Sequence, residues 1–201
     1  MTNNNDFDAL YNAGSESTGS AAASVTRKRE AAPLIGRYRL QYLPFAAMLI
    51  IAIAVILIWL VIWKDALMYI GLGAFVVAML LMIPSYKTAG LLEPFSKEFR
   101  DARKLMRWGG GSTPYDYHMC AGFRELTADV DARLSRSWSR MFAIRIGLVI
   151  VAFVLLFIGI VVKTSPTSAR LILVVLGVAF FALRELLYIL LIGRTINTLA
   201  R

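Results

Sequence analysis

Long runs of apolar residues alternate with polar stretches along this chain. Four runs stand out, at about residues 43–63, 66–84, 146–162 and 171–192. A helix rises about 1.5 Å per residue and the hydrocarbon core of a bilayer is about 30 Å thick, so each run has a length typical of a membrane-spanning helix. With 58% hydrophobic residues in 201, the chain is too apolar for a soluble domain of this size. The pattern predicts an all-α polytopic membrane protein with four transmembrane helices.

The connections between these runs predict how the helices pair. Only Lys64 and Asp65 separate the first two runs, and residues 163–170 separate the last two. Connections this short favour antiparallel neighbours, so we expect two antiparallel hairpins. The organisation that follows is a disordered basic cytoplasmic tail (1–40), a first transmembrane hairpin (41–85), a cytoplasmic amphipathic helical loop (86–140), and a second hairpin with a short C-terminal tail (141–201).

Lysine and arginine residues are distributed very unevenly among the connections. The N-terminal segment, the long central loop and the C-terminal tail hold 18 of them, against 3 in the two short turns. Because basic residues are retained on the cytoplasmic side, this bias predicts that both termini and the central loop are cytoplasmic. We expect the cytoplasmic (inner) membrane. The formal charge of +9 therefore reflects membrane orientation and does not indicate a nucleic-acid partner.

The central loop contains a basic amphipathic stretch. Leu92, Phe95, Phe99, Ala102 and Met106 recur at steps of three and four, and the cations lie mostly off that stripe. One interpretation places this helix along the bilayer surface, with its cations on anionic lipid headgroups. The other packs the stripe on the second loop helix. The residues expected at a membrane-surface or partner-docking site are Phe95, Phe99, Arg100, Arg103, Lys104, Arg107, Phe123 and Trp138.

After three glycines, Ser112-Thr113-Pro114 predicts the start of another helix. Its apolar stripe runs at helical spacing through Tyr115, Met119, Phe123, Leu126, Val130, Leu134 and Trp138. The periodicity continues into the third apolar run, which predicts one long helix projecting from the membrane. The stripe can pair with the first loop helix, with a second copy of the chain, or with another protein.

Two charged residues, Arg184 and Glu185, interrupt the fourth apolar run. Only thirteen apolar residues precede them, a rise of about 20 Å. If both side chains lie inside the bilayer, each needs a partner or water, and the pair marks an internal contact, an ion path or a subunit interface. The alternative is that Arg184 extends to the cytoplasmic boundary. Since adjacent residues on a helix point about 100° apart, we do not expect both side chains to face the same partner squarely.

Most catalytic or metal chemistry has no recognisable motif here. A single cysteine and a single histidine predict neither a disulfide nor a zinc site, and the three glycines lack the Lys-Ser/Thr of a phosphate loop. Glu125, Asp129 and Asp131 lie beside arginines, as on a solvated helix face. We therefore expect no cofactor, no metal and no enzymatic activity.

Two functional hypotheses follow. The first is a non-catalytic integral membrane subunit or assembly protein of a larger complex, which docks other membrane subunits or a second copy of itself through the loop helices. The alternative is a small oligomeric channel or transporter with Arg184 and Glu185 near the pathway. A membrane enzyme acting on lipid is a third class, supported only by the acidic residues of the loop.

Overall fold

Helices make up nearly all of the chain. The computed structural model describes the backbone of residues 5–62, 65–107, 112–161 and 167–201, and within these ranges the side chains from Arg29 onward except 106–107 and 112–114. The elements are α1 (Asn5–Ile62), α2 (Asp65–Gly90), the short 3₁₀ turn η1 (Glu93–Phe95), α3 (Lys97–Arg107), α4 (Ser112–Thr127), α5 (Ala132–Val161) and α6 (Thr167–Leu199). No strand occurs in these ranges.

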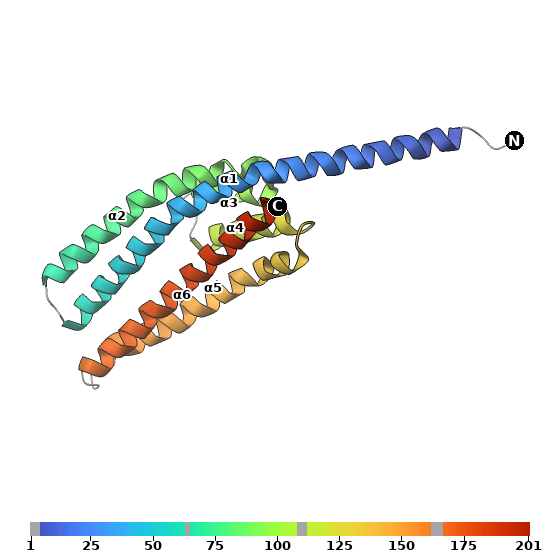
Figure 1. Cartoon of the computed structure of the whole chain (residues 1–201). Coiled ribbons are helices and arrows are strands. Elements are labelled where there is room, and N and C mark those ends of the chain that lie inside the picture. The colour runs from blue at the N-terminus through green and yellow to red at the C-terminus, as the bar shows by residue number, and fades with distance from the viewer. Residues whose placement is uncertain (1–4, 63–64, 108–111, 162–166) are drawn as a thin grey trace.

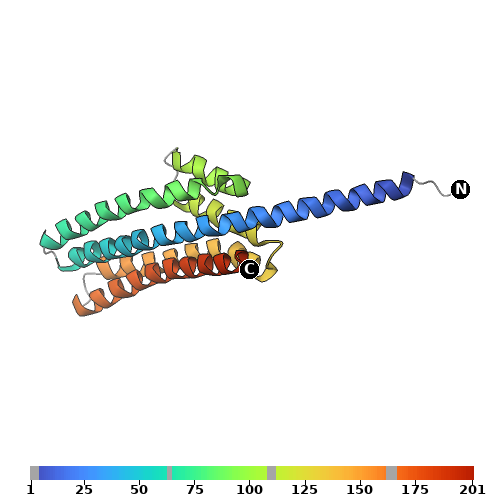
Figure 2. The same cartoon turned by 45° about the horizontal axis from the view of Figure 1, so that its top comes forward.

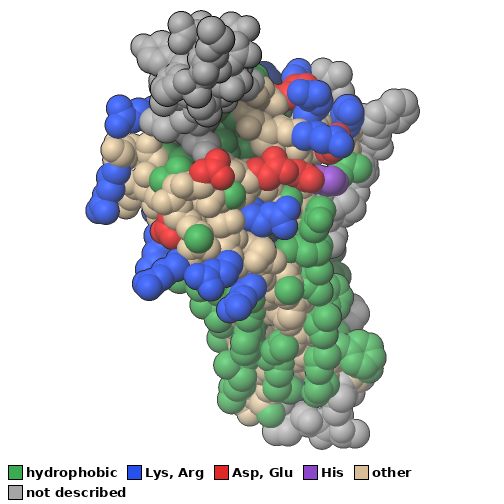
Figure 3. Space-filling view, turned by 90° about the vertical axis from the view of Figure 1, so that its right-hand side faces the viewer, with side chains coloured by type: hydrophobic (Ala, Val, Ile, Leu, Met, Phe, Trp, Pro, Cys, Tyr) green, Lys and Arg blue, Asp and Glu red, His purple; other side chains and the backbone are tan. Residues whose placement is uncertain are grey.

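Four of these helices are long and apolar enough to cross a membrane, which confirms the prediction of four apolar helices of that length. The apolar segments lie within Arg29–Ile62, Asp65–Phe95, Ala132–Val161 and Thr167–Leu199. Large hydrophobic side chains on their outer surfaces, such as Ile70, Phe153 and Ile172, are mostly exposed. Figure 3 shows hydrophobic side chains covering one end of the molecule and charged side chains gathered at the other. We call these the apolar half and the polar end.

The long helices lie side by side in two pairs. α1 packs along α2 and α5 along α6, and α1 also contacts α6, which joins the pairs (Figures 1 and 2). Glycine permits the close approach within each pair. A Cβ on Gly71 would lie 2.6 Å from Ile56 Cγ1, and one on Gly177 would lie 2.6 Å from Leu156 Cγ. Hydrogen in place of a side chain therefore lets the backbones come near in the apolar half.

At the polar end, α3 and α4 close over the ends of the long helices and form an aromatic core with them. The ring centroids of Phe123 and Trp138 are 4.7 Å apart, and those of Phe99 and Phe123 are 5.2 Å apart. Phe99, Phe123 and Trp138 are at most 1% exposed. The expectation that these three belong to a docking surface is wrong, because their stripes pack against each other and against Tyr188 of α6.

The second loop helix and the third apolar run are two helices rather than one. α4 ends at Thr127, whose hydroxyl donates to the carbonyl oxygen of Phe123 at 2.9 Å. After a short turn, the Asp131 carboxylate accepts hydrogen bonds from the backbone N–H groups of Arg133 and Leu134 at 2.8 and 3.1 Å and caps the start of α5. The stripe is also interrupted here, since Val130 is 47% exposed.

The N-terminal segment differs from the predicted disordered tail. The structure has helix from Asn5 onward, and α1 continues through Pro33 and Pro44 into the apolar half. Ala31, Ile35 and Tyr38 are buried on one face of α1 in the aromatic core. Residues 29–40 are thus part of the folded polar end, because a stripe at helical spacing gives them a face to bury. The preceding part of α1 extends away from the other helices (Figure 1).

Candidate functional site

Charged side chains from three helices, three of them buried and one partly buried, meet where the polar end joins the apolar half. They are Asp116 of α4, Arg145 of α5, and Arg184 and Glu185 of α6, which we call the ionic cluster. The side chains of Arg145 and Glu185 are only 3% and 7% exposed. Tyr42 of α1 joins the cluster by donating a hydrogen bond from its hydroxyl to Glu185 Oε2 at 2.6 Å. The cluster therefore links four helices that are far apart in the sequence.

Arg145 occupies the centre of the ionic cluster. Its Nη2 lies 3.3 Å from each carboxylate oxygen of Glu185 and 3.3 Å from Asp116 Oδ2. Its guanidinium carbon lies 4.2 Å from the centroid of the Tyr188 ring, so the cation also faces an aromatic ring. Two carboxylates and one ring face thus compensate for the loss of water around this charge.

Arg184 binds within the protein instead of extending to solvent. Its Nη2 donates to Asp116 Oδ2 at 2.6 Å, and its Nη1 lies 2.8 Å from Glu185 Oε1. As expected, Arg184 and Glu185 do not face the same partner: Arg184 pairs with Asp116, whereas Glu185 pairs with Arg145 and Tyr42, and the two also contact each other. The long guanidinium side chain reaches around the helix to the carboxylates, and α4 brings Asp116 to the same place. Internal contact is the alternative that the structure favours.

The charges of the ionic cluster balance, with two guanidinium groups and two carboxylates. Burial raises the pKa of Asp116, while Arg145 and Arg184 act in the opposite direction. Burial also raises the pKa of the Cys120 thiol, to about 12, so this cysteine stays protonated near neutral pH and is a poor nucleophile. His118 is directed elsewhere, with Nδ1 2.5 Å from Glu98 Oε2. His118 therefore pairs with Glu98 and not with Asp116 or Cys120.

The position of the cluster along the helices places it near one boundary of the apolar region. Val161 ends α5 16 residues after Arg145, a rise of about 24 Å. Glu185 follows the first residue of α6, Thr167, by 18 residues, a rise of about 27 Å. Both distances are measured from the apolar end of the helices, and both are nearly as long as the thickness of a hydrocarbon core, about 30 Å. If that end reaches the opposite membrane face, the cluster lies at the level where acyl chains give way to headgroups.

Two cavities adjoin the ionic cluster, and Asp116, Arg145 and Arg184 line both. The larger is about 340 Å³ and lies between α1, α2 and the cluster, with Leu49 and Met79 on its walls. The smaller is about 170 Å³ and is lined otherwise by apolar side chains of α5, including Ile150, which is 58% exposed. We call the larger one the cluster cavity. Its walls are mainly apolar and its charged groups are confined to the ionic cluster.

Comparison with protein-family models, with curated protein sequences and with solved structures gave no match.

The basic residues predicted on the first loop helix have different surroundings. Arg100 and Lys104 are exposed and pair with carboxylates, with Arg100 Nε 3.9 Å from Glu93 Oε1 and Lys104 Nζ 3.4 Å from Asp101 Oδ1, and Arg103 also forms an ion pair with Glu93. Phe95 is half-buried against the aromatic core. Arg107 ends α3, and its side chain lies outside the described residues. The exposed part of the predicted surface is therefore charged rather than apolar, with its cations beside Glu93 and Asp101.

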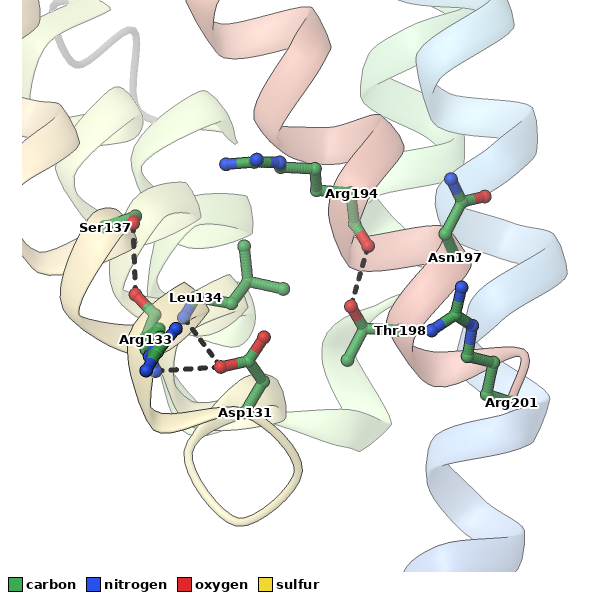
Figure 4. A pocket seen from close by; sticks show the side chains of 8 residues that line it. All are labelled: Asp131, Arg133, Leu134, Ser137, Arg194, Asn197, Thr198 and Arg201. Atoms are coloured by element: carbon green, nitrogen blue, oxygen red, sulfur yellow. Dashed lines mark hydrogen bonds between the residues drawn. The ribbon is translucent and has the colours of Figure 1, made fainter.

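A second basic feature lies at the outer part of the polar end, where α5 begins and α6 ends. A pocket of about 300 Å³ is lined by Arg133, Arg194 and Arg201 together with small polar side chains (Figure 4). Asp131 also lines it, but its carboxylate is engaged with the backbone at the start of α5. Three cations around one hollow form an electropositive site, which we call the arginine pocket.

Sequence patterns did not identify Arg145, Asp116 or Tyr42 as members of a site. Arg145 directly precedes a long apolar run, as basic residues flanking a membrane span do, so the sequence pattern places it in the loop. The pair Arg184 and Glu185 did signal that partners were needed, because charges within an apolar helix require compensation. The identity of the partners depends on how α4 and α5 pack against α6.

Proposed function

We propose that this protein is a non-catalytic integral membrane subunit or assembly protein of a larger complex in the cytoplasmic membrane. In this proposal the four apolar helices cross the bilayer as two antiparallel hairpins. Both termini and the α3–α4 region are cytoplasmic, as supported by the 18 basic residues of those segments against 3 in the short turns. The polar end then faces the cytoplasm and is available to partners there.

The observation that carries the proposal is the contrast between buried apolar faces and an exposed basic surface at the polar end. The stripes of α3 and α4 are used inside the protein, so a partner meets mainly charged groups. The arginine pocket is the most concentrated of these, with Arg133, Arg194 and Arg201 around one hollow of about 300 Å³. A partner with an acidic segment fits this chemistry, since complementary charge speeds association and favours the correct partner.

On the first loop helix, Arg100 and Lys104 supply a second exposed basic face. We assign this face to anionic lipid headgroups, to which each cation near the surface contributes about 1 kcal/mol. Association with a second copy of the chain is the alternative to association with a different subunit. The two complexes have different masses on purification.

Isolation from native membranes in a mild detergent tests the docking proposal. We expect a second membrane protein to copurify in stoichiometric amounts, and the double variant Arg194→Glu with Arg201→Glu to lose most of it. The matched control is Arg124→Glu, because Arg124 is exposed at the polar end but does not line the pocket. Recovery of the unmodified chain alone, as one homogeneous oligomer, contradicts the subunit role.

A second candidate function is a small oligomeric channel or transporter, and one observation favours it. The cavities of about 340 and 170 Å³ both adjoin the cluster that contains Arg184 and Glu185. A solute pathway that passes these charged groups would need such open space beside them. Solute flux into liposomes that contain the purified protein distinguishes the candidates. Flux that is abolished by Arg184→Leu supports transport, whereas a subunit or assembly protein gives none.

A further inference from the structure

The ionic cluster contains guanidinium donors without a nitrogen or oxygen acceptor among the described residues, although the Cys120 side chain also contacts Arg145 through a weak hydrogen bond. Nε and Nη1 of Arg145 and Nε of Arg184 are buried, and none has a nitrogen or oxygen partner among the described residues. A buried guanidinium donor without an acceptor is costly, by about 1–3 kcal/mol or more for a charged group. Both arginines also line the cluster cavity, so an acceptor bound in that cavity lies beside their guanidinium groups.

The carboxylates of the cluster already serve several donors. Glu185 accepts from Tyr42 and Arg145 and also pairs with Arg184, and Asp116 Oδ2 contacts both arginines. What the site lacks is therefore acceptor oxygens and not additional cations. Phosphate oxygens are acceptors only, and guanidinium groups bind them through charge-assisted hydrogen bonds.

The cluster cavity combines this polar end with apolar walls. Phe45 and Leu49 line it from α1, and Met79 and Met82 line it from α2. Its volume of about 340 Å³ is too small for a whole phospholipid, but it can hold part of a headgroup and the upper part of one acyl chain. A free phosphate ion would meet the arginines and leave those apolar walls uncovered.

We propose that the cluster cavity binds one acidic phospholipid, whose phosphate accepts hydrogen bonds from Arg145 and Arg184 and whose acyl chain lies along Leu49 and Met79. The depth of the cluster agrees with this occupant, since Arg145 is about 24 Å from the apolar end of α5. The remainder of the lipid lies in the surrounding bilayer. The site is separate from the arginine pocket and does not depend on the docking proposal.

Lipid titration of the delipidated full chain in detergent, followed by native mass spectrometry, tests the proposal. Phosphatidylglycerol and phosphatidylcholine with identical acyl chains are the two probes, and inorganic phosphate is the competitor. We expect one molecule of the acidic lipid to bind at least tenfold more tightly than the zwitterionic one, without displacement by millimolar phosphate. Equal binding of the two lipids overturns the proposal, and so does displacement by phosphate, which assigns the site to a free anion.

Cavity-filling variants then locate the bound lipid. Met79→Trp places a bulky side chain in the cavity and does not alter the ionic cluster, so we expect at least tenfold weaker binding. Leu80→Trp is the matched control on the same helix, because Leu80 is 61% exposed on the outer surface. Leu49→Phe narrows the cavity from α1 and replaces Met79→Trp if that variant does not fold. Wild-type affinity in a folded cavity variant places the lipid elsewhere and overturns the proposal.

Discussion

The apolar half and the ionic cluster share the helices α1, α5 and α6, yet different contacts hold them together. In the apolar half, Gly71 and Gly177 let neighbouring helices approach until Ile56 and Leu156 fill the space beside them. In the cluster, four charged side chains and Tyr42 replace such packing with ion pairs and hydrogen bonds. Close packing tolerates no added volume, whereas the cluster tolerates no loss of charge balance, so different substitutions damage the two regions.

The largest effect is expected for Arg145→Leu. Glu185 and Asp116 would keep only Arg184 as a cationic partner, and removing one member of a buried ion pair costs about 3–5 kcal/mol. Thermal unfolding in detergent measures the loss. The double variant Arg145→Leu with Glu185→Leu restores the charge balance, so it should be more stable than Arg145→Leu alone. If the double variant is the less stable one, charge balance is not what the cluster requires.

A smaller effect is expected for added volume in the apolar half. In Gly71→Ala the new Cβ would lie 2.6 Å from Ile56 Cγ1, and overpacking of this kind costs about 1–3 kcal/mol. Gly73→Ala is the matched control two residues away, because no atom lies within 4 Å of a Cβ at Gly73. The difference in melting temperature between these two variants reports the close helix approach alone. Equal melting temperatures argue against it.

The smallest effect is expected from the titration of Asp116. Its pKa is raised in the folded protein by burial, so the protonated form is favoured on folding. The resulting contribution to stability is present below the usual pKa of an aspartate and is lost as the pH rises through the raised value. Asp116→Asn removes this titration. Wild type should therefore lose stability relative to Asp116→Asn as the pH rises from the usual pKa of an aspartate through the raised value, as measured by melting temperature, and a wild type that gains stability over this range shows that the two arginines outweigh burial.

How much of the molecule was predictable depends on the range of the forces involved. The four apolar helices follow from local composition, since a lipid phase requires apolar side chains over a fixed length of helix. The apolar stripe that contains Phe99 also predicted correctly that one face of this helix is buried. Its assignment to a docking surface was wrong because periodicity identifies an apolar face but not the surface that covers it. The prediction that the N-terminal tail is disordered was wrong over residues 29–40. The apolar face of this segment packs on residues that lie far along the chain, so its partner cannot be read from local composition.

The sequence by itself determined that four helices are long and apolar enough to cross a membrane and that Arg184 and Glu185 need compensation, because hydrophobic length and the cost of a charge in an apolar helix are properties of a single helix. Only the tertiary structure decided that Arg145, Asp116 and Tyr42 supply that compensation, and that two cavities adjoin them. Ion pairs act over a few ångströms, and residues separated by as many as 143 positions, such as Tyr42 and Glu185, reach that distance only after the helices have packed.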